Sequence, residues 1–412
     1  MSARNWRDSL LRNLIPRGFD HRLRTLSIAL FLNEFGRSLF VVFLPLYYLT
    51  LGVPPLLIGL AITVSAGTSA LFQVIGGVLS DSWGRRRSML VSASGRVVLL
   101  GSLSIFATAI PSFIAIFLLI TAAEALNGIF LTSSNAMISD LVEAPRRAEG
   151  FGIYRVAINF GFTFGSLFGG LMVLYTVSIY AWTLLVLLTL AILNYFLTET
   201  HARERTTFRL GNIISASRDR LLLTFSLVSV GAGLIANQMG PTFAIYSTQN
   251  IGISKQELGY LYFLNGILVI LFQYGFSRLA LRYRLSSLIA ISVVVQSLSY
   301  LMVSFSNNLL LLQIVIVGLT IGEMLQAPAG TAFATAIAPD SRRGEYIGFY
   351  SWGWNSGQAL SPIVGGFLLS LFAGSQYLTW YVIPIVGAFC TIAYLFIGVT
   401  ARRSNPSQGR TL

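Results

Sequence analysis

Long apolar runs separated by short polar connections make up almost the whole chain. Most runs hold about twenty residues or more, which is the length that an α-helix needs to cross a bilayer core of about 30 Å. Strands of a membrane barrel would be only about ten residues long and would alternate in polarity. The pattern therefore predicts an all-α membrane protein with twelve transmembrane helices. These spans are expected at about 25–50, 56–80, 89–110, 112–140, 150–174, 178–198, 221–248, 257–281, 286–304, 308–337, 347–373 and 377–400.

The arginines gather in alternate connections between the spans. Connections after spans two, four, six, eight and ten contain arginine, whereas those after spans one, three, five, nine and eleven carry no charged residue. Basic residues favour the cytoplasmic side of a membrane. We therefore expect a multi-pass protein of the cell membrane, with both termini and every arginine-containing connection in the cytoplasm.

Composition supports this class and excludes several others. The 412 residues are 55% hydrophobic and only 10% charged, whereas a soluble domain carries roughly 25% charged residues. The net charge of +13 is spread over short connections, which is typical of membrane orientation rather than of a nucleic-acid-binding surface. One cysteine and two histidines make no disulfide framework or metal cluster. With no nucleotide-binding or catalytic motif either, we expect no cofactor, no metal and no enzyme activity.

The two halves of the chain repeat one another in sequence. Residues 146–170, in span five, match residues 342–366, in span eleven, at arginine, glutamate, tyrosine, asparagine and glycine positions. We therefore expect two pseudo-symmetric six-helix bundles, an arrangement in which transporters bind substrate between the bundles. The predicted segments are a cytoplasmic N-terminal segment at 1–24, bundles at 25–198 and 221–400, a cytoplasmic central loop at 199–220 and a cytoplasmic tail at 401–412.

A charged turn separates spans two and three. Residues 77–87 read Gly-Val-Leu-Ser-Asp-Ser-Trp-Gly-Arg-Arg-Arg. Together with the repeated halves, this turn resembles the loop 2–3 signature of the major facilitator superfamily, and the resemblance covers essentially the whole chain. It implies the major facilitator fold, transport by alternating access, and a conformational latch that includes an acid at the end of span four. The latch residues are expected to be Gly77, Asp81, Gly84, Arg85, Arg86 and Asp140.

Span five resembles the glycine-rich signature of drug:proton antiporters, although Ser166 stands where that signature has a proline. The same glycines also suit plain close packing of helices, and both interpretations stay open. Span four departs further from drug antiporters, because Glu124 stands where they carry an arginine. The helix-packing residues are expected to be Gly161, Gly165, Gly169 and Gly170 in span five and Gly357, Pro362, Gly365 and Gly366 in span eleven.

Four charged residues lie well inside the predicted spans, where ionisable side chains are costly and usually functional. Glu34 and Arg37 are one helical turn apart in span one, so they can pair. The resemblance places spans one, four, seven and ten around a central cavity. We expect Glu34, Glu124 and Glu323 to be the proton-coupling candidates. Arg37 is their expected charge partner, and the alternative is a static network in which Arg37 bridges Glu34 and Glu124.

Several polar and aromatic residues of the spans are candidates to line the same cavity. Asparagine and glutamine can instead hydrogen-bond between helices, and tryptophan can pack in a core, so both roles stay open. Two further arginines, Arg96 and Arg155, lie near the cytoplasmic side and are expected to snorkel toward it. The substrate-cavity candidates are Asn33, Asn127, Asn237, Gln238, Asn265, Gln326, Trp352, Trp354 and Asn355.

These observations predict a secondary active transporter that works by alternating access. The resemblance favours proton-coupled export of small amphiphilic or drug-like compounds. The alternatives are a proton-coupled importer of a small metabolite, sugar or peptide, and a non-transporting membrane sensor, while a channel fits the repeated halves less well. The expected partners are a small-molecule substrate, protons and the lipid bilayer, without nucleic acid, and the chain is expected to act as a monomer.

Overall fold

The computed structural model describes residues 20–143, 146–172, 174–200, 219–280, 282–339 and 342–404. Within these ranges the chain is helical and contains no β-strand. Most of the predicted N-terminal segment 1–24, of the central loop 199–220 and of the tail 401–412 lies outside the described residues. Their cytoplasmic placement stays a prediction.

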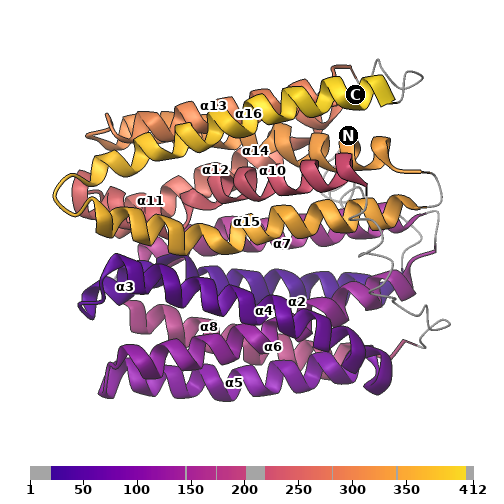
Figure 1. The fold of residues 1–412 in the computed structure, drawn as a ribbon. Helices are drawn as coiled ribbons and strands as arrows, with labels where there is room; N and C mark the ends of the chain where they lie inside the picture. The colour runs from indigo at the N-terminus through magenta and orange to yellow at the C-terminus, as the bar shows by residue number, and fades with distance from the viewer. Residues whose placement is uncertain are drawn as a thin grey trace, which may run out of the picture. The chain divides into compact units, whose positions relative to one another are not determined.

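Twelve long helical segments follow one another along the described residues (Figure 1). Ten of them are single helices: α4 (Pro55–Trp83), α5 (Arg85–Ala109), α6 (Phe113–Leu141), α7 (Arg147–Leu171), α8 (Tyr175–Phe196), α12 (Lys255–Leu279), α13 (Leu285–Val303), α14 (Leu309–Ile337), α15 (Arg343–Leu371) and α16 (Thr379–Ser404). Ten of the twelve segments are long and apolar enough to cross a membrane. The two others are α7 and α15, which are rich in glycine and polar residues. The predicted class, an all-α membrane protein with twelve helices, is confirmed.

The first and seventh segments are interrupted near their middle, which the continuous apolar runs did not indicate. The first comprises α2 (His21–Ser38), η1 (Val41–Phe43) and α3 (Leu44–Thr50). The seventh comprises α10 (Arg220–Ala236), η3 (Asn237–Met239), α11 (Pro241–Tyr246) and the π-helical η4 (Ser247–Ile251). Pro45 and Pro241 lie in the first turns of α3 and α11, where a helix needs no backbone N–H donor. The two breaks occupy corresponding places in the repeated halves.

Both interrupted segments also begin at an aspartate. The Asp20 carboxylate accepts a hydrogen bond from the backbone N–H of Arg22 at 2.9 Å, and that of Asp219 from Leu221 at 2.8 Å. A carboxylate at this position satisfies free amides and lies at the positive end of the helix dipole. The Arg22 side chain also donates to Asp20, which holds the pKa of that carboxyl below its usual value.

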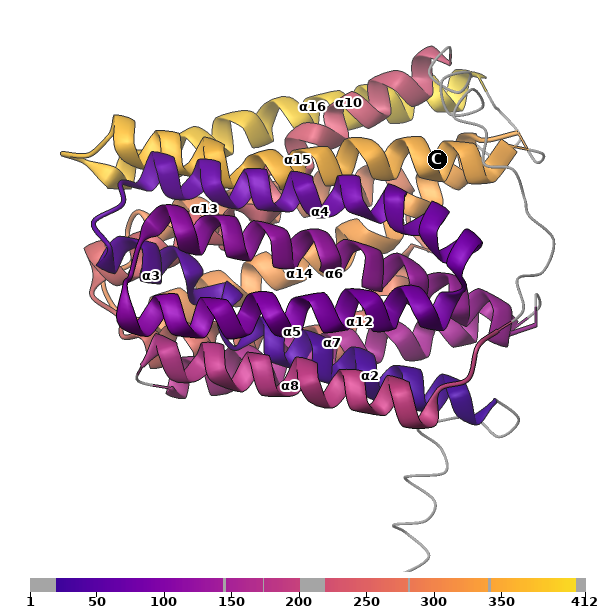
Figure 2. The ribbon, with the colours of Figure 1, turned by 90° about the horizontal axis from the view of Figure 1, so that it is seen from below.

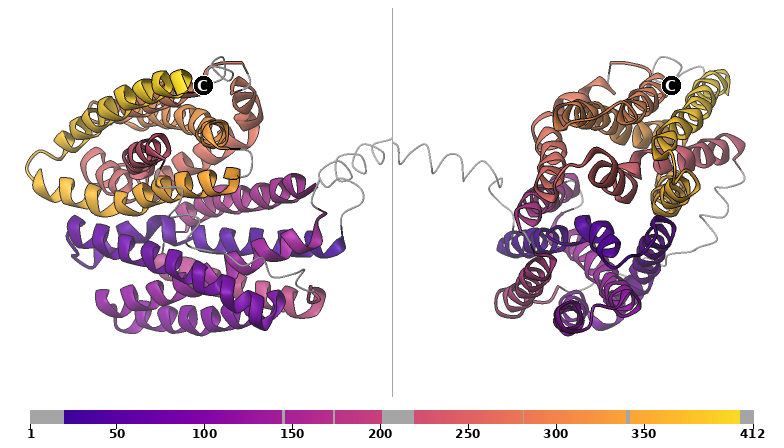
Figure 3. Two further views of the ribbon diagram at one scale, coloured as in Figure 1. Left: turned by 45° about the vertical axis from the view of Figure 1, so that its right-hand side comes forward. Right: turned by 90° about the vertical axis from the view of Figure 1, so that its left-hand side faces the viewer.

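The chain divides into two compact units. Unit 1 comprises Met1–Phe40, Ser65–Gly165 and Met172–Thr206, and unit 2 comprises Val41–Val64, Ser166–Leu171 and Thr207–Leu412. In unit 1, α5 packs against α6 and α8, and α2 packs along α8 (Figure 2). In unit 2, α10 packs along α15, and α13 packs along α14 and α16. An end-on view shows the helices within each unit running side by side (Figure 3). The predicted division into bundles at 25–198 and 221–400 stays a prediction.

Glycines let α7 approach α2 closely in unit 1. A Cβ atom on Gly161 would lie 2.7 Å from the carbonyl oxygen of Phe31 and 2.9 Å from the backbone nitrogen of Phe35. A Cβ atom on Gly165 would overlap the Ser38 hydroxyl, which donates a hydrogen bond to the Gly161 carbonyl at 3.2 Å. Backbones can approach this closely only where the side chains between them are small.

The matching glycines of α15 make the same kind of contact with α10 in unit 2. A Cβ atom on Gly357 would overlap the carbonyl oxygen of Val230 and would lie 2.8 Å from the backbone nitrogen of Leu234. A Cβ atom on Gly365 would lie 2.6 Å from the side-chain oxygen of Gln238. The close packing is therefore real, and whether these glycines also mark an antiporter stays a prediction. The rest of the predicted packing set is buried: Gly169, Gly170, Pro362 and Gly366.

We predict that Gly161→Ala destabilises unit 1, because the added methyl group has no room against the α2 backbone. Overpacking of this kind costs about 1–3 kcal/mol in the free energy of unfolding. Gly152→Ala on the same helix is the matched control, since nothing lies within 4 Å of its Cβ position. Thermal unfolding of the purified variants in detergent measures both. Equal unfolding temperatures for the two variants would contradict close α2–α7 packing.

Candidate functional site

A buried group of charges links α2 to α6 in unit 1. Arg37 lies between two carboxylates: its Nη1 donates to Glu34 Oε1 at 3.1 Å, and its Nε donates to Glu124 Oε1 at 2.9 Å. The Arg37 side chain is 28% exposed, against 10% for Glu34 and 8% for Glu124. One cation therefore neutralises one of two nearly buried acids, and these three residues carry a net negative charge. We call Glu34, Arg37 and Glu124 the acid cluster.

Local helix geometry and one tertiary contact build this cluster. Glu34 and Arg37 lie one turn apart on α2, so they share a face of that helix. The packing of α6 against α2 brings in Glu124. One turn further along α6, Asn127 accepts a hydrogen bond from Asn33 Nδ2 at 3.2 Å. The two helices are therefore joined by two polar links, and Asn33 and Asn127 both take part in helix–helix bonding.

Arg96 of α5 lies beside the cluster, and the expectation that it snorkels is wrong. Its side chain is only 1% exposed. Nη1 donates a hydrogen bond to Asn33 Oδ1, and the guanidinium carbon lies 6.0 Å from the centre of the Trp182 ring. The reason is that α5 packs against α6 and α8, so this face of α5 points into unit 1. Arg155 of α7, by contrast, is exposed.

Glu323 lies in unit 2 and belongs to a different environment. It is an exposed residue of α14, and its Oε2 accepts a hydrogen bond from Asn265 Nδ2 of α12 at 3.2 Å. The same Asn265 amide donates to Thr320 Oγ1 at 2.9 Å. No ion pair is found between Glu323 and a cation of the described residues. Of the four charges singled out from the sequence, the structure brings three together within unit 1, and Glu323 belongs to unit 2.

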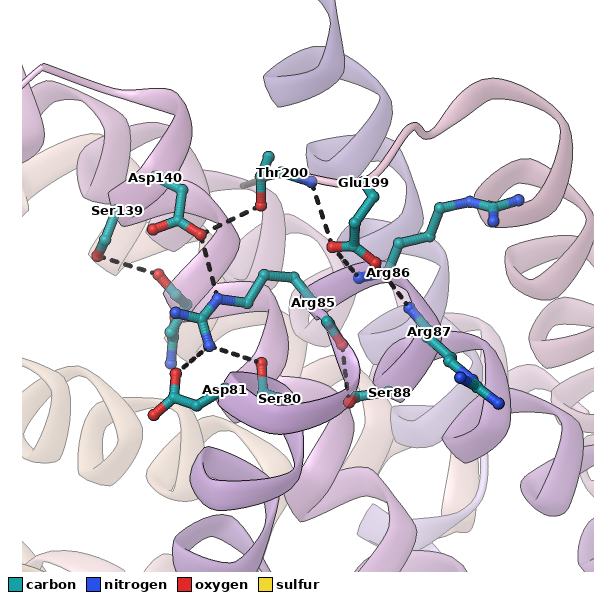
Figure 4. Close-up of polar contacts among 12 residues, drawn as sticks. Ser80, Asp81, Arg85, Arg86, Arg87, Ser88, Ser139, Asp140, Glu199 and Thr200 are labelled. Carbon is teal, nitrogen blue, oxygen red and sulfur yellow. Dashed lines mark hydrogen bonds and ion pairs between the residues drawn. The ribbon is translucent and has the colours of Figure 1, made fainter. Parts of the chain in front are cut away.

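The charged turn between α4 and α5 forms a second polar centre of unit 1 (Figure 4). Arg85, the first residue of α5, pairs with Asp81 in the last turn of α4, and its Nε donates to Asp140 Oδ2 of α6 at 3.1 Å. Gly84 makes the turn with a φ of 99°, a conformation that favours glycine. Arg86 Nη2 donates to the backbone carbonyl of Asn194 at 2.8 Å, at the end of α8.

Two residues just after α8 complete this centre and were missed from the sequence. The Glu199 carboxylate accepts hydrogen bonds from the backbone amides of Arg86 at 3.0 Å and Arg87 at 3.3 Å (Figure 4). Glu199 therefore caps the free backbone amides at the N-terminus of α5, where the helix dipole stabilises a negative charge. Thr200 Oγ1 donates to Asp140 Oδ2 at 3.1 Å. The only sequence signal was an acid immediately after an apolar span. Gly77, the remaining latch candidate, has a single loose neighbour, with Thr132 Cγ2 3.7 Å from its Cβ position.

Residues 26–247 and 221–411 each match the profile of one family, the Major Facilitator Superfamily. This chain belongs to the Major Facilitator Superfamily. It is therefore a multi-pass membrane protein and a secondary transporter of small molecules, not an enzyme.

Relatives of known sequence and structure agree with this family. The chain is 25% identical over 397 residues to the uncharacterized MFS-type transporter YqjV of Bacillus subtilis, covering 92% of this chain and 93% of YqjV. It is 24% identical over 350 residues to the multidrug resistance protein MdtH of Salmonella typhi, covering 83% and 85%. Its fold is similar to the crystal structure of the nucleoside transporter NupG, with a TM-score of 0.78 at 16% identity, covering 92% of this chain and 99% of NupG.

The remaining cavity candidates of this superfamily member fall into two groups. Asn237, Gln238 and Gln326 make bonds between helices: the first two donate to the backbone carbonyls of Gln358 and Ser361, and Gln326 accepts from Ser292. These contacts agree with the packing interpretation of the three amides. The other group is Trp352, which is 56% exposed, Trp354, which is half-buried, and Asn355, which is exposed.

We predict that Arg37→Gln destabilises the protein, because it leaves two nearly buried carboxylates without a cation. Breaking a fully buried pair costs roughly 3–5 kcal/mol, and the partial exposure of Arg37 lowers our expectation to about 2 kcal/mol. Arg155→Gln, on the exposed face of α7, should leave the unfolding temperature unchanged. Adding Glu124→Gln to Arg37→Gln should restore part of the loss. An Arg37→Gln protein as stable as the wild type would contradict the acid cluster.

Proposed function

We propose that this transporter exchanges protons for small amphiphilic or drug-like compounds and exports those compounds from the cell. The acid cluster carries the proposal. Ionisable groups at membrane depth are costly, and they commonly serve ion or proton pathways. Glu124 stands on α6 where drug antiporters carry a base, so a carboxylate here replaces a fixed positive charge with a group that can gain and lose a proton.

The ion pair between Arg37 and Glu124 gives proton binding a mechanical consequence. A proton bound to Glu124 removes its charge, and the attraction that holds α6 to α2 at this point is lost. The balance between two states of the carrier then shifts, because the proton binds one state better than the other. A cationic amphiphile that approaches the same carboxylates competes with the proton, and this competition couples the two fluxes.

Export is supported by the likeness to MdtH, which is a multidrug resistance protein. We further propose that the chain acts as a monomer in the cell membrane, with bundles at 25–198 and 221–400 and both termini in the cytoplasm. The alternating arginine-containing connections support this orientation. Glu34, Glu124 and Glu323 remain the proton-coupling candidates, with substrate contacts at Trp352, Trp354 and Asn355.

We predict that Glu124→Gln and Glu323→Gln each abolish proton-driven transport. The measurement is uptake of a fluorescent lipophilic cation into everted membrane vesicles with an acidic lumen, together with the protons that leave. Glu149→Gln is the matched control, since this half-exposed acid pairs with Arg146 at the surface. If both single variants still accumulate the cation against its gradient, proton coupling through these acids is wrong.

A proton-coupled importer of a small metabolite, sugar or peptide is the second candidate. The observation that favours it is Ser166, which occupies the proline position of the antiporter signature. The same vesicles separate the two candidates. An exporter moves solute into an acidic lumen as protons leave, whereas an importer releases preloaded solute together with those protons. A membrane sensor would show neither movement.

We predict that Asp81→Asn impairs transport while substrate binding is largely retained. The physical reason is that Arg85 loses one of its two carboxylate partners, which weakens the proposed latch without touching a cavity residue. Ser82→Ala is the control, because among the described residues the Ser82 hydroxyl bonds only to backbone carbonyls of its own helix. Binding of the fluorescent cation to purified protein and uptake into vesicles give the two readouts. Normal uptake by Asp81→Asn would overturn the latch.

A further inference from the structure

Arg96 is a buried cation with most of its donors unused. Its side chain is 1% exposed, and one hydrogen bond from Nη1 reaches the neutral Asn33. Among the described residues, its Nε and Nη2 atoms have no hydrogen-bond partner. Burying an arginine without a paired acid costs several kcal/mol. Because Arg96 has no ion-pair partner within the described part of the chain in the observed conformation, we expect an acid to pair with it in another conformation.

A carboxylate lies on the neighbouring helix at the same level. α5 and α6 are in close contact here, since the Cβ position of Gly95 is 2.6 Å from Leu126 Cδ1 and Ser92 donates to the Leu126 carbonyl. Leu126 is two residues from Glu124. Asn33 further links Arg96 to Asn127, which is one turn from Glu124 on α6. Glu124 is therefore among the charged residues that surround Arg96.

We propose that Arg96 is the second partner of Glu124, and that the Glu124 carboxylate moves from Arg37 to Arg96 when the transporter changes state. The two unused nitrogens, Nε and Nη2, form the edge of a guanidinium that binds a carboxylate through two parallel hydrogen bonds. Asn33 occupies Nη1 and so fixes the guanidinium with that edge free. Arg96 is a positioning residue in this scheme, because it acts through Glu124.

Burial decides between Glu124 and a substrate anion as the partner. Arg96 is closed off from solvent in this state, which excludes a substrate anion as its partner. Glu124 already belongs to the same buried group. When Glu124 leaves Arg37, the more exposed Arg37 keeps only Glu34. The two arginines thus share one mobile carboxylate and define two discrete arrangements, as a bistable element requires. This inference rests on the proposed proton-coupled function and adds the residue that receives the carboxylate.

We predict opposite effects of Arg96→Gln on stability and on transport. Removing an unpaired buried cation should leave the unfolding temperature of the protein in nanodiscs unchanged or raised. Uptake of the fluorescent cation should nevertheless fall about tenfold or more. Arg96→Lys keeps the charge without the two-donor edge, so it should restore part of the uptake. A drop in the unfolding temperature of Arg96→Gln comparable to that of Arg37→Gln would overturn the proposal, because it would indicate a purely structural role.

A conformational readout tests the switch without any substrate. In a Cys390→Ser background, one spin label on unit 1 and one on unit 2 report distance populations at acidic and at alkaline pH. The charged groups around Arg96 are Glu34 and Arg37 on α2 and Glu124 on α6. The wild type should populate two distances, and Arg96→Gln only one at either pH.

Two populations in Arg96→Gln, in the wild-type ratio, would overturn the switch. Glu124→Gln combined with Arg96→Gln should behave like either single variant, because both remove the same interaction. A wild type whose two populations do not respond to pH would count against proton coupling, while the number of populations in Arg96→Gln would still decide the role of Arg96. The failure of the proposed function and the failure of this inference are therefore distinguishable.

Discussion

The cost of burying charge governs the polar interior of unit 1. Glu34, Glu124, Arg37 and Arg96 form one group there, and the formal charges of these two acids and two bases sum to zero. The pairing is nevertheless uneven, because Arg37 contacts both acids and Arg96 contacts neither. A neutral but unevenly paired group can redistribute its contacts without moving net charge into or out of the interior. Such redistribution is far less costly than exposing or burying a new charge.

Close glycine packing makes this redistribution a choice between discrete states. Gly161 and Gly165 hold the α7 backbone against α2, the helix that carries Glu34 and Arg37. Interiors packed at this density do not deform continuously. Side chains that change partners within such a frame move between defined positions, and helices move as rigid elements. The corresponding contact of Gly357 with α10 gives unit 2 the same property.

The sequence predicted those features that depend on local pattern. Apolar runs of membrane-spanning length gave the helices, and the spacing of Glu34 and Arg37 gave their contact, because residues one turn apart must share a face. Hydropathy reports how deep a residue lies along a helix but not which way it points. Arg96 was therefore expected to snorkel toward the cytoplasm, although its face of α5 is covered by neighbouring helices. The break after Ser38 was hidden because apolar residues continue through it, whereas Gly240 and Pro241 do mark the break after Ala236 and were not used as a signal.

Contacts between distant segments account for what remained hidden near the charged turn. Glu199 and Thr200 follow α8, and no local pattern connects them with Gly84 or Asp140. α8 packs along α5. The residues that follow α8 therefore lie beside the first residues of α5. Glu199 then supplies the negative charge that the amides at this helix end favour. The resemblance to a family signature predicted the roles of Arg85 and Asp140 but carried no information about Glu199 and Thr200.

The two polar centres of unit 1 share the same pair of helices. Arg85 and Arg96 both lie on α5, and Asp140 and Glu124 both lie on α6. Arg85 already binds Asp140, and Arg96 is the proposed second partner of Glu124. A shift of α6 relative to α5 must therefore change both centres together, because each helix is a rigid rod over this length. The charged turn and the buried acids are in this sense one mechanical element, and a proton that alters the pairing of Glu124 acts on the same helix that ends at Asp140.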